Sequence, residues 1–468
     1  MPKQTRDQRP SVPATHDRLS RRRFLKRVAA ASATAVAVPF IAPASALGRD
    51  GHVAPSERIV MGCIGTGKRG TGDLGIFLKQ KDVQVVAVCD VETRSQLYLQ
   101  GTTAGREPAK ELVERHYAKT AAAGTYKGCK AFGDFRDLLR IGDIDAVCVA
   151  TPDHWHALIS IAAANAGKDI YCEKPLANSV AEGRAVCTAV EKNGRVLQTG
   201  TQERSRDNAR FASELIRNGR IGKLHTVRIQ MPCSEPHHNK VRALKGMPAP
   251  ESPPEGFDYD FWLGHTPKVP YTPSRCHFWW RFVLSYGGGE MTDRGAHIID
   301  LAQMGMDTEG TGPVEIEAKG SRETGLYNTF MDYEFTNTFA GGVRMIGENR
   351  GPRGVKFEGT EGWIFLHVHG CAIEAEPKSL LKEKIGPEEI QLGRSPGPHR
   401  NFLDCVKSRK NPVATAEIGH RSATICHLNN IAMLTESKLA WDPVKERFKG
   451  NDAANALLSP TMRVPWSL

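Results

Sequence analysis

The stretch CIGTGKRGTGD at residues 63–73 decides how the first half of this 468-residue chain is interpreted. It overlaps the end of a short apolar run, RIVMGCIG at residues 58–65, which is typical of a buried parallel strand ended by glycine. The spacing of Gly65, Gly67 and Gly70 matches the G-x-G-x-x-G loop that joins a strand to a helix and holds a pyrophosphate. A glycine-rich turn without a ligand is the structural alternative.

An acidic residue at the end of the next apolar run favours the nucleotide interpretation. Residues 83–90 read VQVVAVCD, and Asp90 lies 20 residues beyond Gly70, where the acid that binds a ribose is expected. Asp90 would repel a 2′-phosphate, so NAD is favoured, while Arg69 and Arg94 keep NADP possible. The cofactor-binding residues predicted from this loop are Gly65, Thr66, Gly67, Lys68, Arg69, Gly70 and Asp90.

Alternating strands and helices continue to about residue 200. Apolar runs at 145–150, 169–172 and 196–200 predict strands, and the segments 154–167 and 180–193 predict helices. This alternation predicts an α/β fold with a doubly wound parallel sheet, a Rossmann domain over residues 56–200.

The pattern changes in the second half, which we assign to a separate domain at 201–468. Residues 233–286 are rich in Pro, His and aromatic residues and show no clear period. Longer, more polar runs at 328–335 and 342–346 predict strands of a large, mostly antiparallel sheet, and residues 402–434 predict a helical tail.

The N-terminus has the features of an export signal. Residues 20–46 read SRRRFLKRVAAASATAVAVPFIAPASA, with Arg21 and Arg22 before a weakly apolar run that two prolines interrupt. The run is too short and too polar for a stable membrane anchor, and the small residues at its end predict cleavage after Ala46. The paired arginines indicate a twin-arginine signal and hence a periplasmic or secreted protein that uses the twin-arginine export machinery. The alternative is a basic, Ala-rich tail.

Charge and cysteine content narrow the function classes. The net charge is +11, but residues 1–46 hold nine basic and two acidic residues, which leaves +4 for the remainder. A surplus this small, without a basic stripe, gives no support for nucleic-acid binding. The eleven cysteines form no Cys-x-x-Cys pair, and several lie in apolar runs. We therefore expect buried free thiols, as in a protein that folds in the reducing cytoplasm.

Two further stretches could carry chemistry. Glu173-Lys174-Pro175 follows the strand at 169–172, at the sheet edge where α/β folds bind ligands, and a lysine there can hydrogen-bond a hydroxyl group. GGGEMTDRGAHIID at 287–300 places Asp293 four residues before His297, on one face if the segment is helical. A neutral histidine can accept a hydroxyl proton and a carboxylate can orient its ring. A surface lysine, a helix-capping Asp and an ordinary helix His are the structural alternatives.

Taken together, these motifs resemble the Gfo/Idh/MocA oxidoreductases, with GTGKRG, TPDHWHA at 151–157, CEKPLA at 172–177 and GGGxxxDxGxH at 287–297 as the marks. The resemblance covers nearly all of the chain after the leader. It implies a catalytic set of Lys174, Asp293 and His297, and it places Thr151, Pro152, His156 and Glu173 with Lys174 at the cofactor. It also implies a C-terminal α/β domain whose open sheet forms the interface of a homo-oligomer, a dimer or tetramer.

The segment 233–286 departs from the shorter dehydrogenases of that family. Its Trp279, Trp280 and Arg281 are candidates, with His297, for binding a sugar ring by stacking and hydrogen bonds. The spacing of its histidines predicts no metal site.

Three functions remain open from the sequence. The first is an NAD(P)-dependent oxidoreductase that acts on a sugar, cyclitol or related polyol with a tightly retained cofactor. The second is a glycoside-cleaving enzyme that oxidises its substrate transiently, with no net redox change. The third is a catalytically silent sugar-binding protein on the same scaffold.

Overall fold

The computed structural model describes residues 53–119, 124–370 and 372–468. The predicted export signal and its cleavage site after Ala46 lie outside the described residues. Residues Glu57–Leu468 form one compact unit, and the description that follows concerns this unit. Among the described helices, none combines the length and the apolar character that crossing a membrane requires.

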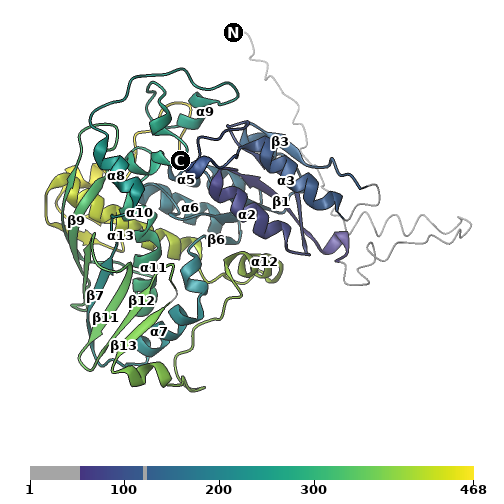
Figure 1. Cartoon of the computed structure of the whole chain (residues 1–468). Helices are drawn as coiled ribbons and strands as arrows, with labels where there is room; N and C mark the ends of the chain where they lie inside the picture. The colour runs from purple at the N-terminus through teal and green to yellow at the C-terminus, as the bar shows by residue number, and fades with distance from the viewer. Residues whose placement is uncertain (1–52, 120–123, 371) are drawn as a thin grey trace, which may run out of the picture. The chain divides into compact units, whose positions relative to one another are not determined.

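The first half of the unit is built on a six-stranded parallel sheet with the order β3-β2-β1-β4-β5-β6 (Figure 1). Its strands are short, and all except the edge strand β3 are mostly buried, as the continuous apolar runs predict for a sheet covered on both faces. The order reverses direction between β1 and β4, which creates the crevice where such sheets bind ligands. The predicted doubly wound sheet is therefore confirmed. The strands are β1 (Ile59–Ile64), β2 (Val83–Cys89), β3 (Lys130–Phe132), β4 (Ala146–Val149), β5 (Asp169–Cys172) and β6 (Leu197–Thr199).

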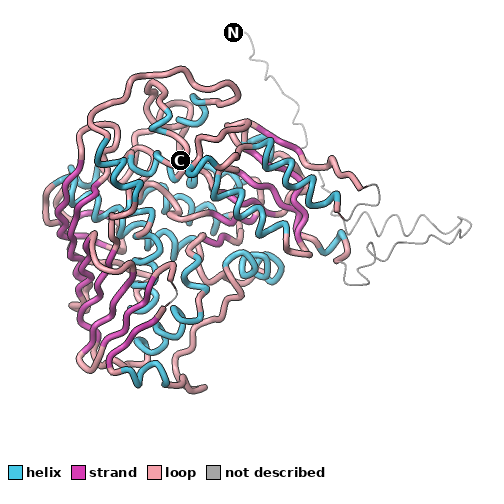
Figure 2. The backbone as a smooth tube through the Cα atoms, viewed as in Figure 1, coloured by secondary structure: helices cyan, strands magenta, loops and turns pink. Residues whose placement is uncertain are grey.

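Helices follow these strands and pack against the sheet (Figure 2). The two helices predicted after β4 and β5 are present with ends within two residues of the expected ones. The second begins with a cap in which Ser179 Oγ accepts a hydrogen bond from the backbone N–H of Glu182. The helices of this half are α2 (Lys68–Leu78), α3 (Arg106–Ala118), α4 (Phe135–Leu139), α5 (Asp153–Asn165) and α6 (Val180–Lys192).

A nine-stranded sheet with the order β13-β12-β11-β7-β10-β9-β8-β14-β15 forms the second half. Every neighbouring pair is antiparallel except β7 and β10, so the predicted mostly antiparallel sheet is confirmed. Helices α7 (Asp207–Arg217), α11 (Gly295–Met306) and α13 (Ala416–Thr435) pack against this sheet (Figure 1). Its strands are β7 (Leu224–Gln230), β8 (Glu315–Arg322), β9 (Phe330–Thr338), β10 (Arg344–Glu348), β11 (Gly354–Gly359), β12 (Trp363–His367), β13 (Ile373–Glu376), β14 (Leu439–Asp442) and β15 (Arg447–Phe448).

The helical tail consists of two helices that join different halves of the unit. Helix α12 (Pro398–Ser408) buries Phe402 and Leu403 in the core under the parallel sheet, whereas α13 packs on α6, α11 and β8. His399 Nε2 lies 2.9 Å from Asp73 of α2, and Arg409 binds Asp169 of β5 through both carboxylate oxygens. The tail therefore returns to the parallel sheet before it completes the second half.

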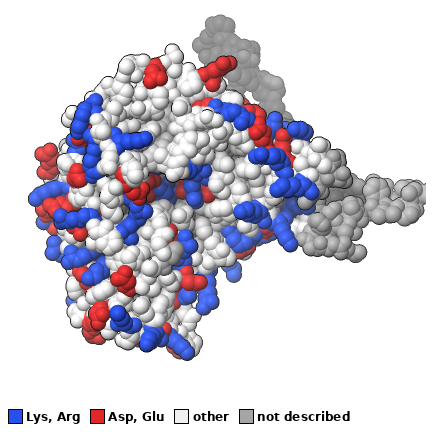
Figure 3. All heavy atoms as spheres, in the orientation of Figure 1, with Lys and Arg blue, Asp and Glu red and all other residues white. Residues whose placement is uncertain are grey.

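The segment without a clear period, 233–286, is mostly loop. It contains the short helices α8 (Pro236–Ala243) and α9 (Tyr259–Leu263) and the 3₁₀ turns η4 (Pro273–Arg275) and η5 (Trp279–Phe282). Trp262 and Trp280 are buried in the core of the second half. Lys/Arg and Asp/Glu side chains are interspersed over the face shown in Figure 3.

Candidate active site

The glycine loop is shaped by close backbone contacts that only glycine permits. Gly65 has a φ of +82°, and a Cβ atom there would lie 2.6 Å from the backbone nitrogen of Thr151. A Cβ atom on Gly70 would lie 1.8 Å from the carbonyl oxygen of Gly65. Gly70 therefore lets the first turn of α2 pack directly against the end of β1, as the motif predicts.

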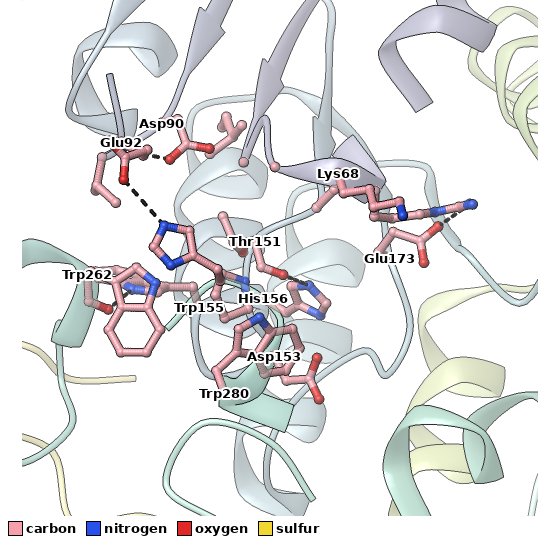
Figure 4. Close-up of a pocket in the computed structure, with 18 of the residues that line it drawn as sticks. Lys68, Asp90, Glu92, Thr151, Asp153, Trp155, His156, Glu173, Trp262 and Trp280 are labelled. Carbon is pink, nitrogen blue, oxygen red and sulfur yellow. Dashed lines mark hydrogen bonds and ion pairs between the residues drawn. The ribbon is translucent and has the colours of Figure 1, made fainter. Parts of the chain in front are cut away.

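Asp90 braces this loop. Its Oδ2 accepts hydrogen bonds from the backbone N–H of Thr66 at 2.6 Å and from Thr66 Oγ1 at 3.3 Å, and its Oδ1 accepts from the backbone N–H of Glu92 at 2.9 Å. Burial raises the pKa of Asp90. Asp90 also lines the cavity beside the glycine loop, together with Glu92, which Figure 4 shows next to it.

The cations near the loop are already paired. Arg69 lies 2.7 Å from Glu173 Oε1 and 3.0 Å from Asp73 Oδ1, and Arg94 forms an ion pair with Glu111. Lys68 donates to Gln100 Oε1 at 2.7 Å. The two arginines that kept NADP possible are thus bound to carboxylates, an arrangement that favours NAD over a cofactor with an additional phosphate.

His156 connects the turn after β4 to the residues that follow β5. His156 Nδ1 lies 2.7 Å from the carbonyl oxygen of Pro175, and its Nε2 lies 2.9 Å from that of Thr151 (Figure 4). This bridge fixes Thr151 and Pro152 beside Lys174. Thr151, Pro152, His156 and Lys174 line the same cavity as the glycine loop.

Lys174 and Asp293 meet at the far end of this cavity, although 119 residues separate them in sequence. Lys174 Nζ donates to Asp293 Oδ1 at 2.6 Å and to the carbonyl oxygen of Asp293 at 2.9 Å. Arg281 Nε donates to the same Oδ1 at 3.3 Å. Burial opposes ionisation of Asp293, but the charges of Lys174 and Arg281 outweigh it and hold the pKa of Asp293 well below its usual range. The carboxylate is therefore ionised at neutral pH.

His297 lies beside this pair on a separate helix. The chain bends at Arg294, between α10 (Glu290–Asp293) and α11, so Asp293 and His297 do not share one continuous helix. The Asp293 carboxylate binds Lys174 and Arg281, and among the described residues the buried Nδ1 of His297 has no partner. Burial, then the charge of Lys174, hold the pKa of His297 well below its ordinary value, so its ring is neutral at neutral pH.

Two cavities meet at these residues. The cofactor cavity, of about 490 Å³, runs from the glycine loop to Lys174 and is also lined by the aromatic side chains of Phe257, Trp262 and Trp280 (Figure 4). The distal cavity, of about 500 Å³, lies between α8, η5 and the hairpin after β12. The residues common to both are Leu99, Lys174, Phe278, Asp293 and His297.

The predicted substrate residues are divided between the two cavities. Trp279 lines the distal cavity, whereas Trp280 and Arg281 line the cofactor cavity. The Arg281 guanidinium carbon lies 4.4 Å from the centre of the Trp280 ring, so these two side chains stack on each other. Of the predicted cofactor residues, Thr66 and Gly70 shape the loop without lining the cavity.

Three residues at the site escaped the sequence analysis. Glu92 is buried in the cofactor cavity, and its Oε1 lacks a hydrogen-bond partner in the described part of the chain. Asp153, in the quoted TPDHWHA stretch, lines the same cavity, and burial raises its pKa well above the ordinary value. His369 lies with its ring centre 5.3 Å from that of His297 and has a φ of +67°. Only Asp153 belongs to a motif that could have revealed it.

The histidines of α8 come close to an acidic residue. Within the described residues, potential ligand atoms of His237, His238 and Glu290 lie within 4.8 Å of one another. His238 Nδ1, however, accepts a hydrogen bond from the backbone N–H of Glu235 at 3.0 Å, so in the neutral ring Nε2 carries the proton and donates to Glu290. The Nε2 lone pair that a metal would need is therefore occupied.

Comparison with protein families identifies both halves of the chain. A model described as the NAD-binding Rossmann fold of an oxidoreductase family matches residues 59–201. A second model, described as the C-terminal alpha/beta domain of an oxidoreductase family, matches residues 213–468.

Curated relatives match part of the chain. Levoglucosan dehydrogenase of Pseudarthrobacter phenanthrenivorans is 40% identical over 171 residues, which is 36% of this chain and 35% of the relative. Inositol 2-dehydrogenase of Salmonella paratyphi B is 32% identical over 164 residues, 35% of this chain and 42% of the relative. The match to an uncharacterized oxidoreductase of Bacillus subtilis, at 29% identity, covers 41% of this chain and 50% of that protein. The chain thus spans half or less of the length of these relatives.

Solved structures share the fold over most of the chain. Aldose-aldose oxidoreductase from Caulobacter crescentus covers 82% of this chain and 99% of its own length, with a TM-score of 0.56 and 18% identity. The WlbA dehydrogenase from Bordetella pertussis, in complex with NADH and UDP-GlcNAcA, gives the same coverage and TM-score with 16% identity. At these identities the similarity shows the fold alone.

Proposed function

Because the chain belongs to the Gfo/Idh/MocA oxidoreductase family, we propose that it is an NAD-dependent oxidoreductase acting on a CH–OH group of a sugar, cyclitol or related polyol. The observation that carries this proposal is the meeting of Lys174, Asp293 and His297 where the cofactor cavity opens into the distal cavity. The levoglucosan and inositol dehydrogenases among the relatives support the substrate class.

The cofactor cavity fits a dinucleotide. The Gly65–Gly70 contact brings backbone N–H groups at the start of α2 to the floor of the cavity, where a pyrophosphate is stabilised by the helix N-terminus. The unpartnered Oε1 of Glu92 and the carboxylate of Asp90 stand at the end of β2, where ribose hydroxyls are bound in this fold. Lys68, Arg69, Thr151 and Pro152 complete the walls.

The residues at the junction have distinct roles in the proposed reaction. The chemistry that NAD supplies when bound is acceptance of a hydride from the carbon bearing the hydroxyl group. Lys174 donates a hydrogen bond to the hydroxyl oxygen and stabilises the negative charge that develops there. His297 is neutral, so the ring nitrogen that carries no proton accepts the hydroxyl proton. Asp293 holds the Lys174 ammonium in place and its charge favours the protonated His297 ring.

The walls of the cofactor cavity support the proposed retention of the cofactor. Phe257, Trp262 and His277 of the segment 233–286 line the cavity opposite the glycine loop. Lys68, at the start of α2, donates hydrogen bonds to Leu99 and Gln100 and so connects their loop to the helix. A dinucleotide enclosed in this way would leave slowly, so the reduced cofactor would be reoxidised in place by a second substrate.

Export and assembly form part of the proposal. The leader at 1–46 supports a periplasmic or secreted protein exported by the twin-arginine route, which transports folded proteins with their cofactors. The face of the nine-stranded sheet that α7, α11 and α13 leave uncovered supports a homo-oligomer. Light scattering of the purified protein would measure the oligomeric state, and fractionation of the producing cells its compartment.

One experiment tests cofactor and reaction together. The purified protein is denatured, the released nucleotide is identified, and a second sample is mixed with a panel of sugars and polyols while nicotinamide absorbance is followed. We expect about one equivalent of NAD(H) per chain and reduction of the bound NAD by at least one polyol. Absence of any nucleotide, with no reduction when NAD is added, would contradict the proposal.

The same samples separate the two alternative functions. A glycoside-cleaving enzyme would release the aglycone from a synthetic glycoside without accumulating an oxidised sugar. A silent binding protein would bind sugars while the bound nicotinamide kept its redox state throughout.

A further inference from the structure

The distal cavity has more positive than negative charge on its walls. The cations that line it are Lys174, Lys240, Arg294 and Arg353, and the acids are Glu235 and Asp293. Two neighbouring charged side chains are included in the count of charges, because Arg281 binds Asp293 and Glu290 binds Arg294. Five cations therefore face three carboxylates, a surplus of two positive charges.

Each of the three carboxylates contacts two of the basic side chains around it. Asp293 Oδ1 accepts from both Lys174 and Arg281. Glu235 Oε1 lies 2.7 Å from Arg294 and also accepts from Arg353. Glu290 lies 2.7 Å from Arg294 Nε and accepts from His238. Each acid thus shares its charge between partners and neutralises no further cation.

One surplus charge is on Lys240, and the other belongs to Lys174 and Arg281, which share Asp293; Arg353 adds a cation that is incompletely hydrogen-bonded. Lys240 is exposed at the cavity and forms no ion pair with a carboxylate of the described residues; its Nζ lies 5.9 Å from the ring centre of Trp279. Arg353 shares Glu235 with Arg294, directs its other terminal nitrogen to His369 Nδ1 at 3.3 Å, and has a buried Nε without an acceptor in the described structure. A buried N–H of a charged group without a partner is costly and is relieved by an anionic ligand.

His369 on this wall adds no charge at neutral pH. Burial and the neighbouring charge of Arg353 lower the pKa of His369 to about 4, so its ring is neutral at pH 7. Trp279 forms a half-buried aromatic wall at the same cavity, and an aromatic face stacks on the apolar side of a sugar ring. The cavity therefore combines a sugar platform with an unneutralised positive field.

We infer that the substrate is an acidic sugar, one that carries an anionic substituent such as a carboxylate, and that Lys240 and Arg353 recognise this substituent. The inference rests on the proposed function, because it places the carbon to be oxidised at Lys174 and His297, where both cavities meet. A part-buried cavity lined by charges of one sign concentrates ligands of the opposite sign and raises their association rate. A neutral sugar would leave Lys240 without a counter-charge among the described residues, and the Nε of Arg353 without an acceptor there.

The test compares sugars that differ only in charge. The protein with its resident cofactor is assayed for nicotinamide reduction with glucose and glucuronate, with galactose and galacturonate, and with glucose 6-phosphate and glucose 6-sulfate. We expect kcat/KM to be at least about 10-fold higher for an anionic sugar than for its neutral counterpart, and this advantage to shrink as ionic strength rises. A preference for the phosphate or sulfate over the uronate would support the anionic class and identify the substituent.

Matched variants locate the effect. Lys240→Met removes an exposed charge without disturbing the fold, and we expect it to lower the anionic-to-neutral ratio of kcat/KM about 10-fold, mainly through KM. Lys192→Met removes the same charge from an exposed position outside both cavities and should leave the ratio unchanged. Arg353→Gln should lower the ratio further.

Each failure has a separate meaning. Equal kcat/KM for neutral and anionic sugars, or an unchanged ratio in Lys240→Met, would overturn the acidic-sugar inference and leave the oxidoreductase intact. Reduction of the bound NAD by no sugar of either kind would overturn the proposed function and this inference with it.

Discussion

Lys174 Nζ lies 2.6 Å from Asp293 Oδ1 and 2.9 Å from the carbonyl oxygen of Asp293, so one ammonium group joins the end of the parallel sheet to the helix pair α10 and α11. The Lys174 side chain is only 14% exposed, and it lines both cavities. A ligand hydroxyl at the junction would meet a cation whose position is already fixed.

Lys174→Ala should therefore abolish hydride transfer while the nucleotide remains bound. A positioned hydrogen-bond donor or acid contributes about 10²–10⁴-fold to such a step. Single-turnover reduction of the bound NAD measures the loss, and the nucleotide released on denaturation measures cofactor content. Lys192→Ala is the matched control. Undiminished single-turnover reduction in Lys174→Ala would contradict the assignment of this lysine.

Gly70→Ala should prevent cofactor binding and destabilise the start of α2. Its Cβ would lie 1.8 Å from the carbonyl oxygen of Gly65, a backbone atom that cannot move aside without displacing β1 or the helix. Gly75→Ala, in the same helix, has no described atom within 4 Å of its Cβ and should be neutral or stabilise the protein by about 0.5–1 kcal/mol. Nucleotide content and urea unfolding distinguish the two variants. Normal nucleotide content in Gly70→Ala would count against the loop as the pyrophosphate site.

Asp90→Asn should reduce the preference for NAD over NADP at least about 10-fold, because it removes the negative charge that repels a 2′-phosphate. The amide oxygen can still accept one of the three hydrogen bonds that Asp90 receives from Thr66 and Glu92, so partial bracing of the loop is retained. Rebinding of each nucleotide to stripped protein measures the ratio. Asp137→Asn, an exposed acid of α4, controls for the change in net charge. An unchanged ratio would assign the discrimination to Glu92.

Stability should fall between about pH 6.5 and pH 4.5. Burial lowers the pKa of His154 to about 3 and that of His265 and His427 to about 4, whereas the unfolded chain binds protons at these rings near pH 6.5. Below pH 6.5 the unfolded state thus binds more protons and is favoured. Burial raises the pKa of Glu182 to about 7, so the folded state binds one proton that the unfolded state lacks and offsets one histidine. Across these four groups, the net of two protons contributes about 2–3 kcal/mol per pH unit.

Urea unfolding at several pH values and constant nucleotide concentration measures this slope. His427→Gln keeps a donor for the carbonyl oxygen of Ala177 and should reduce the slope by about one proton. His225→Gln, at an exposed position, should leave it unchanged. A stability that stays constant from pH 7 to pH 5 would contradict the prediction.

The parallel sheet was predictable because its signals are local. Each strand is a short apolar run ended by a turn residue, and Gly65, Gly67, Gly70 and Asp90 have spacings that few other structures require. The carboxyl ends of β1, β4 and β5 meet at one edge, so the motifs at Gly65, Thr151 and Lys174 converge once the strand order is known.

The arrangement of the remaining site residues could not be predicted, because it depends on contacts that sequence spacing does not encode. The four-residue interval between Asp293 and His297 indicates one helix face, but the chain bends at Arg294 and the carboxylate binds Lys174 and Arg281 instead. His369 lies in a hairpin far from His297 in sequence, and only the folding of β12 and β13 brings it to His297. Glu92 follows Asp90 by two residues, and the sequence has no feature that directs its side chain into the cavity.

Helix α12 has a consequence for how the molecule is made. Phe402 is fully buried between Phe77 of α2 and Tyr171 of β5, so the core beneath the first sheet contains side chains that the ribosome adds long after β6, the last strand of that sheet. A fragment that stops near residue 201 would emerge with an open hydrophobic gap where Phe402 and Leu403 belong. The nucleotide-binding half therefore closes only after α12 has been made.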